Sequence, residues 1–129
     1  MIKEYNKVIS VIIVEDEIVS ALYLKSILEK ENFKVLNIVS DGRDAIKKIE
    51  EQKPDVIIMD ILLSGRINGV KVAKAVRNFT DSPIIFTTGY SSSDIIMKIG
   101  YIKNSSYLEK PLDVNKIVSL IYEIFDKTK

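Results

Sequence analysis

The sequence of 129 residues contains neither cysteine nor histidine. Without cysteine the chain has no disulfide and no thiolate metal site, and a reducing compartment such as the cytoplasm suits it. Without histidine it lacks imidazole for acid–base catalysis and metal binding, and it carries no phosphohistidine of its own. Any chemistry must therefore come from carboxylates, hydroxyls, lysines and the backbone.

Long apolar runs and an excess of one charge are also missing. No apolar run reaches the ~18 residues of a membrane-spanning helix, and the run at 8–14 leads into acids with no small-residue cleavage site. The formal net charge is +1, with 47% hydrophobic and 29% charged residues. We expect one cytoplasmic domain over residues 1–129, with its core at about 8–125, that contacts neither membrane nor nucleic acid directly.

Short apolar runs rich in β-branched residues alternate with longer segments that have helical spacing. The short runs lie at 8–14, 35–39, 56–59, 84–88 and 107–108. The segments with helical spacing lie at 18–28, 45–49, 70–76, 95–99 and 117–125. Asp113 and Ser91 stand where helix N-caps are expected. Five strands, each followed by a helix, predict a parallel sheet.

Two of the short runs are apolar at every position, which indicates how the sheet is covered. They are Val-Ile-Ile-Val at 11–14 and Val-Ile-Ile-Met at 56–59. A parallel sheet with helices on both faces requires such runs. Right-handed crossovers leave few topologies. We predict an α/β fold of the flavodoxin-like (βα)5 type, with a five-stranded parallel sheet in the order 2-1-3-4-5.

Polar residues stand at the carboxyl ends of four predicted strands. They are Glu15, Asp16, Glu17, Asp60, Thr87, Thr88 and Lys110. In a parallel sheet these ends share one edge, and in the order 2-1-3-4-5 the first and third strands are neighbours at the crevice where ligands bind. The acids of 15–17 and Asp60 should therefore lie close together, with Thr88 and Lys110 nearby.

A cluster of carboxylates needs a compensating charge. Two carboxylates ~4 Å apart repel by ~4 kcal/mol at an effective dielectric constant of 20, so Glu15, Asp16 and Asp60 favour a shared cation. With oxygen ligands only, Mg²⁺ suits the site best and Mn²⁺ is an alternative. Beside such an ion Asp60 would be a nucleophile toward a phosphoryl group, and Lys110 and Thr88 would bind phosphoryl oxygens.

Each of these residues also has an ordinary structural explanation. Asp60 alone could be a turn residue or a helix cap, and the acids at 15–17 suit the first turn of a helix. Thr88 alone is a normal strand residue, and Lys110 before Pro111 is a normal solvated lysine in extended chain. The functional interpretation depends on all four occurring together, each at the end of the expected strand.

Four motifs in this order make the sequence similar to a known family. They are Val-Glu-Asp-Glu at 14–17, Met-Asp-Ile-Leu-Leu at 59–63, Thr-Thr-Gly-Tyr at 87–90 and Tyr-Leu-Glu-Lys-Pro at 107–111. The chain resembles the receiver domain of two-component response regulators over nearly its whole length. The resemblance implies that Asp60 is the phosphoacceptor and also a ligand of the metal ion. It further implies that Asp16 binds the ion directly and that Glu15 acts mainly through water. Leu62 would bind the ion through its backbone carbonyl.

The resemblance also assigns the residues that sense phosphorylation. Thr88 matches the switch hydroxyl, Tyr107 matches the switch aromatic residue, and Lys110 matches the family's catalytic lysine. The bond between Lys110 and Pro111 is expected to be cis. Leu62 and Tyr90 flank the site and are expected to hinder the water that hydrolyses the acyl phosphate, which predicts slow self-dephosphorylation.

The sequence departs from the commonest family pattern at four places. The acidic pair is Glu-Asp at 15–16, Thr87 replaces an apolar residue, and Gly89 replaces an alanine. The segment 102–106 lacks the Gly-Ala pair that usually precedes the last strand. The glycine-bearing loop at 64–69 is explained well enough as a turn into the following helix.

The resemblance implies a signalling function rather than an enzyme with its own substrate. A sensor histidine kinase or phosphotransfer protein would donate the phosphoryl group to Asp60 with Mg²⁺ bound. The surface formed by 95–99, 107–108 and 117–125 would then change and be read by a downstream protein or output domain. The broadly apolar last helix also suits a homodimer formed on phosphorylation. The sequence leaves open whether the receiver stands alone or is part of a longer regulator.

Three other functions are possible on a fold of this kind. A Mg²⁺-dependent phosphatase that works through an aspartyl phosphate usually has Asp-x-Asp after its first strand, whereas position 62 is leucine here and the nucleophile follows the third. A nucleotide or flavin binder would need glycines after the first strand, where this chain has Glu-Asp-Glu. A docking module on the same fold, without chemistry, would not require the intact set of site residues.

Overall fold

The computed structural model describes residues 8–63, 68–89 and 93–126. In this part of the chain, strands and helices alternate from one end to the other. The strands are β1 Ser10–Val14, β2 Lys34–Val39, β3 Val56–Asp60, β4 Ile84–Thr88 and β5 Ser105–Glu109. The helices are α1 Ile18–Lys30, α2 Gly42–Gln52, α3 Gly69–Val76, α4 Ser93–Gly100 and α5 Val114–Asp126. No helix of this part is long and apolar enough to cross a membrane.

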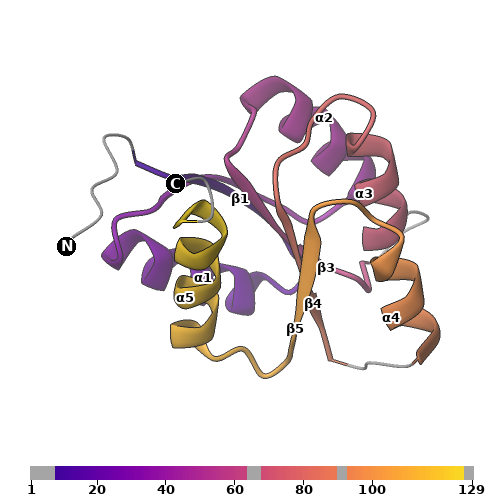
Figure 1. Cartoon of the computed structure of the whole chain (residues 1–129). Helices are drawn as coiled ribbons and strands as arrows, with labels where there is room; N and C mark the ends of the chain where they lie inside the picture. Colours follow the sequence, from indigo (N-terminus) through magenta and orange to yellow (C-terminus); the bar gives the residue numbers. More distant parts are fainter. Residues whose placement is uncertain (1–7, 64–67, 90–92, 127–129) are drawn as a thin grey trace.

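The five strands form one parallel sheet in the order β2-β1-β3-β4-β5, as the sequence predicted. In Figure 1, α1 and α5 cover one face of this sheet, whereas α2, α3 and α4 cover the other. Successive residues of a strand serve opposite faces. Ile13 packs in the core beneath α1 and α5, and Ile12 and Val14 pack in the core on the other side.

The limits of the first and last strands differ from the prediction by more than one residue, whereas β2 and β3 are each one residue longer than predicted and β4 agrees. The first strand begins at Ser10 rather than at 8, because the ladder with β2 starts there and Val8 is exposed. The last strand extends from Ser105 to Glu109 because all five residues pair with β4. It is an edge strand with partly exposed side chains, so polar residues are tolerated there and an apolar run underestimates its length.

Side-chain caps fix the starts of three helices. The carboxylate of Asp113 accepts a hydrogen bond from the N–H of Asn115 at 2.9 Å, which confirms the predicted cap of α5. Asp41 caps α2 in the same way, and Asn68 caps α3. The other predicted cap, Ser91, lies outside the described residues. These caps set where each helix starts after the carboxyl end of a strand.

Candidate phosphoacceptor site

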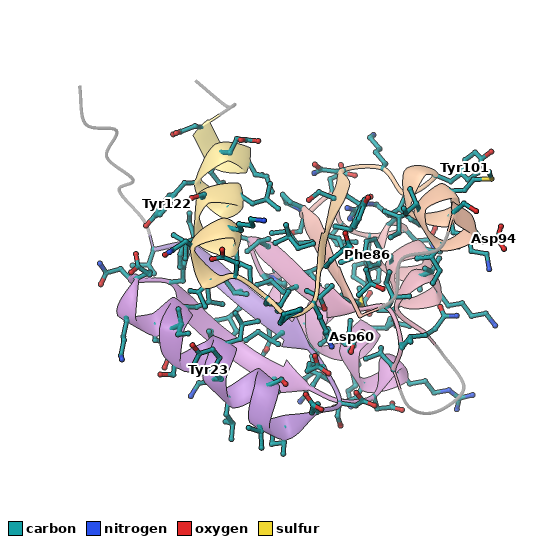
Figure 2. All side chains as sticks on the ribbon, turned by 90° about the horizontal axis from the view of Figure 1, so that it is seen from below. Tyr23, Asp60, Phe86, Asp94, Tyr101 and Tyr122 are labelled. Carbon is teal, nitrogen blue, oxygen red and sulfur yellow. The ribbon has the colours of Figure 1, made fainter. Side chains whose placement is uncertain are left out.

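The predicted acids meet at the carboxyl edge of the sheet. β1 and β3 are neighbours, so Glu15 and Asp16, which follow β1, lie beside Asp60, which ends β3. One carboxylate oxygen from each of the three residues lies within 4.8 Å of the others. Glu15 is 7% exposed and Asp60 is 6% exposed, whereas Asp16 is open to solvent. Figure 2, in which the molecule is seen from below, shows Asp60 near the middle of the view.

Lys110 joins the two buried acids. Its Nζ atom donates to Oδ2 of Asp60 and to Oε1 of Glu15, both at 2.9 Å. The lysine is placed by its backbone, whose N–H donates to the carbonyl of Thr88 at 2.7 Å. The following bond to Pro111 is cis, as expected. A single ammonium group thus balances part of a buried double negative charge.

Backbone N–H groups bind the remaining carboxylate oxygens of the two acids. The N–H of Leu62 donates to Oδ1 of Asp60, and the N–H of Glu17 donates to Oε2 of Glu15, each at 3.1 Å. All four oxygens of the buried pair therefore accept a hydrogen bond. These bonds hold both carboxylates in fixed orientations, which is the arrangement that a nucleophile or a metal ligand needs.

The electrostatics of the site favour a cation. Burial raises the pKa of Glu15, and the nearby charge of Asp60 adds to this, while hydrogen bonds from Lys110 and Glu17 oppose it. Burial by itself would lower the pKa of Lys110, but its hydrogen bonds to Asp60 and Glu15 outweigh this and raise the pKa. Lys110 alone leaves the three acids with excess negative charge.

The donor set fits a hard divalent ion. Every available ligand atom is an oxygen, and Asp16 is reachable from solvent while Glu15 and Asp60 form the inner wall. Carboxylate oxygens with room for water are the usual environment of Mg²⁺. Glu15, Asp16 and Asp60 would hold the ion. The predicted ligation by the carbonyl of Leu62 stays a prediction.

The two threonines at the end of β4 are both buried, but they occupy different places. Thr87 pairs directly with Asp60, and its carbonyl accepts the N–H of Ile61 at 3.1 Å. Thr88 is 1% exposed and pairs with Glu109 of β5. Its predicted role as the switch hydroxyl stays a prediction. Among the described residues, a Cβ at Gly89 would meet nothing within 4 Å, so a glycine is no steric necessity there.

Tyr107, the predicted switch residue, lies at the surface of β5. It pairs with Phe86 of β4, and 37% of the residue is exposed. It borders a groove of about 730 Å³ between α4, β5 and α5, together with Ile96 and Leu120. Its inward rotation on phosphorylation stays a prediction. Tyr90 and the loop 64–67 lie outside the described residues.

Gly69 belongs to the site, although the sequence predicts only a turn at this position. It is the buried first residue of α3, and its N–H donates to the carbonyl of Ile61 at 2.8 Å. A Cβ atom here would collide with the backbone carbonyl of Asp60 and lie 2.9 Å from Cα of Ile61. Glycine therefore lets α3 start directly against the backbone of Asp60. The signal in the sequence that could have indicated this role is the position of Gly69 directly after Asn68, the residue that caps α3.

A cavity of about 570 Å³ lies beside the acids, between α1 and the start of α5. Its lining is mainly apolar and includes Leu24 and Leu112, while Glu15, Thr87 and Lys110 stand on its wall. The exposed residues Ile18, Val19, Leu22 and Tyr23 lie on the adjoining helix α1. The polar site thus adjoins an apolar surface.

This fold and this cluster agree with an independent comparison. A family model for the response regulator receiver domain matches residues 11–122. The chain belongs to the receiver domain family. A receiver domain is not a classical enzyme, and it implies a histidine kinase as partner. The phosphatase interpretation is therefore set aside.

Relatives and solved structures point to the same family. Transcriptional regulatory protein PdtaR of Mycobacterium tuberculosis is 28% identical over 111 residues, which are 86% of this chain and 54% of that protein. The receiver thus spans about half the length of the curated relatives it matches. The signal receiver domain of a modulated diguanylate cyclase from Desulfovibrio desulfuricans G20 is 28% identical, with a TM-score of 0.86 over 94% of this chain and 96% of that one. A two-component response regulator from Clostridium difficile is 25% identical, with a TM-score of 0.87 over 94% and 98%.

Proposed function

We propose that this receiver accepts a phosphoryl group on Asp60 from the phosphohistidine of a sensor kinase or phosphotransfer protein, with Mg²⁺ bound at Glu15, Asp16 and Asp60. The observation that carries the proposal is the buried Asp60 carboxylate. It is held by the N–H of Leu62 and by Lys110 within a cluster of acids that can share an ion.

The reaction is a transfer between two nucleophiles. A carboxylate oxygen of Asp60 forms a bond to phosphorus while the bond between phosphorus and the donor's imidazole nitrogen breaks, and the imidazole leaves neutral after it takes up a proton. The ion, when bound, supplies positive charge that offsets the acids and the phosphoryl oxygens. Lys110, already bonded to Asp60, adds charge on the other side, so no general base is needed.

The exposed apolar residues of α1 support a protein as phosphoryl donor. Ile18, Val19, Leu22 and Tyr23 are exposed on the helix that begins next to Glu15 and Asp16. A continuous apolar surface of this kind is typical of a protein interface. A donor that covers α1 would bring its phosphohistidine over Asp60 and exclude water from the transfer.

The consequence of phosphorylation would be a change at the edge strand β5 and the helices α4 and α5 beside it. New phosphoryl oxygens attract the hydroxyl of Thr88 and the ammonium of Lys110, whose backbones are already hydrogen-bonded to each other. Tyr107 then fills the space that Thr88 leaves. The groove between α4, β5 and α5 changes shape, and a downstream protein or output domain reads it, or a second copy does.

The test is incubation with acetyl phosphate, a small donor that needs no kinase, with Mg²⁺ or with excess EDTA. Intact-mass measurement should show one phosphate adduct on the wild type only when Mg²⁺ is present. Asp60→Asn should show none, whereas the matched control Asp81→Asn, an exposed aspartate far from the cluster, should behave as wild type. Equal adducts on Asp60→Asn and wild type would contradict the proposal. No adduct on either would favour a docking module without chemistry.

A further inference from the structure

Thr87 places a hydroxyl group at the end of an apolar face of the sheet. Successive residues of a strand serve opposite faces, so Thr87 shares the face of Ile85, which packs in the core beneath α1 and α5. On the two neighbouring strands the same core contains Ile13 and Ile58. The family resemblance predicts an apolar residue at position 87, and the function proposed above gives the threonine no role.

This hydroxyl has no partner in the protein, although the residue is only 2% exposed. The carbonyl of Thr87 is bonded to Ile61, but its side chain makes no hydrogen bond within residues 8–63, 68–89 and 93–126. In the same part of the chain no fully enclosed side-chain oxygen or nitrogen lacks a partner, so the hydroxyl opens into the cavity that Thr87 lines. Because a buried hydroxyl without a hydrogen bond lowers stability, the position suits a ligand that bonds to it.

The cavity beside α1 combines an apolar wall with a few buried polar groups. Its volume of about 570 Å³ falls within the usual range of sites for small organic molecules. Leu24 and Leu112 belong to the apolar part of the wall, and Tyr23 adds an aromatic ring. Glu15 and Thr87 supply the polar part, and both are more than nine-tenths buried. A molecule with an apolar body and one polar end matches this lining.

The charges around the cavity favour a cation. Among the described residues, the wall carries two carboxylates, those of Glu15 and Glu17, and one ammonium group, that of Lys110. This ammonium group donates to Glu15 and to Asp60, so its charge is divided between two acids. Asp60 pairs with Thr87 on the neighbouring strand, which brings the hydroxyl close to the excess negative charge. A ligand with an ammonium group is therefore attracted, and a ligand with a carboxylate is repelled.

We propose that this cavity is a binding site for a small aromatic amine. The ammonium group of the ligand donates to the hydroxyl oxygen of Thr87 and to the carboxylate of Glu15. Each oxygen of that carboxylate accepts one hydrogen bond from the protein and has a lone pair for another. The ring of the ligand lies against Leu24 and Leu112, with Tyr23 on the wall of the same cavity. A rigid ring covers apolar surface at a small cost in conformational entropy.

The absence of tryptophan makes the experiment direct, because indole fluorescence then reports on the ligand alone. Tryptamine is the probe, and tryptophol and indole-3-acetate carry the same ring with a neutral hydroxyl or a carboxylate. Titrations are made in EDTA without a phosphoryl donor. The emission of tryptamine should shift to the blue, with a Kd of about 2 mM or below for about twelve non-hydrogen atoms. Tryptophol should bind at least about fivefold more weakly, and indole-3-acetate should not bind.

Variants test the two polar groups that bind the amine. Thr87→Val keeps the shape of the side chain without its hydroxyl and should weaken tryptamine binding about tenfold or more, as should Glu15→Gln. Thr80→Val, the same substitution outside the cavity, should bind as the wild type does. Circular dichroism verifies folding. NMR of the wild type locates the ligand even if a variant does not fold: the N–H signal of Leu112 should shift, and that of Ser106, in the groove between α4, β5 and α5, should not.

Four results would overturn the amine site: no binding of tryptamine up to about 10 mM, equal binding of indole-3-acetate, wild-type affinity in folded Thr87→Val or Glu15→Gln, or NMR shifts confined to the groove between α4, β5 and α5. Failure of Asp60 to accept a phosphoryl group is a different result. It would refute the phosphoacceptor function and leave the amine site standing, because no titration involves a phosphoryl donor.

Discussion

Replacing Lys110 by methionine should destabilise the metal-free protein strongly. Methionine keeps most of the apolar stem but removes the charge that lies 2.9 Å from both Asp60 and Glu15. Removing one partner of a buried ion pair costs about 3–5 kcal/mol. The side chain of Lys110 is 28% exposed, so solvent screens part of the interaction. We therefore expect a loss of about 2–3 kcal/mol in the free energy of unfolding.

The loss should depend on Glu15, because the variant leaves two buried carboxylates without their common partner. In a Glu15→Gln background a single buried carboxylate remains, so Lys110→Met should cost less by at least about 1 kcal/mol. Added Mg²⁺ should stabilise Lys110→Met more than the wild type, since the ion supplies the missing positive charge.

Urea unfolding followed by circular dichroism, in EDTA and in excess Mg²⁺, measures these free energies. Thermal unfolding should show a fall of roughly 6–12 °C for Lys110→Met in EDTA. Lys47→Met, at an exposed position of α2, is the matched control and should change little. A loss below about 0.5 kcal/mol, or the same loss with and without Glu15, would refute the reasoning.

Three further predictions concern neighbouring features. Gly69→Ala should lower the free energy of unfolding by about 1–3 kcal/mol, measured in urea, because its Cβ collides with the backbone of Asp60; Gly100→Ala, where a Cβ meets nothing within 4 Å among the described residues, should not. Leu22→Ser should slow phosphotransfer from a partner kinase but not phosphorylation by acetyl phosphate, and equal slowing would contradict docking on α1. The raised pKa of Lys110 means that its contribution to stability is present at neutral pH and is lost above about pH 10.4; an unchanged pH dependence in Lys110→Met would contradict this.

Most of the fold could be predicted because its signals are local. Runs such as Val-Ile-Ile-Met before Asp60 need burial on both faces, which indicates a parallel sheet covered by helices on both sides, and right-handed crossovers leave few strand orders besides the observed one. The acids that follow β1 and β3 could be placed together from the topology alone. The bonds of Lys110 to Glu15 and Asp60 agree with that inference.

What the sequence could not predict depends on contacts between distant segments. The bonds of Arg77 to Lys103 and Asn104 span 26 and 27 residues, and nothing around Arg77 in the sequence indicates them. The need for glycine at position 69 arises only when α3 lies against the backbone of Asp60. The edge strand β5 was predicted too short, because pairing rather than burial defines it.

The most direct test of the central claim is to identify the phosphorylated atom. After treatment with acetyl phosphate and Mg²⁺, borohydride reduces an aspartyl phosphate to homoserine, which peptide mass spectrometry locates. We predict homoserine at position 60 in the presence of Mg²⁺ and aspartate there when EDTA is added. Unmodified aspartate at position 60 in protein that carries a phosphate adduct would contradict the account.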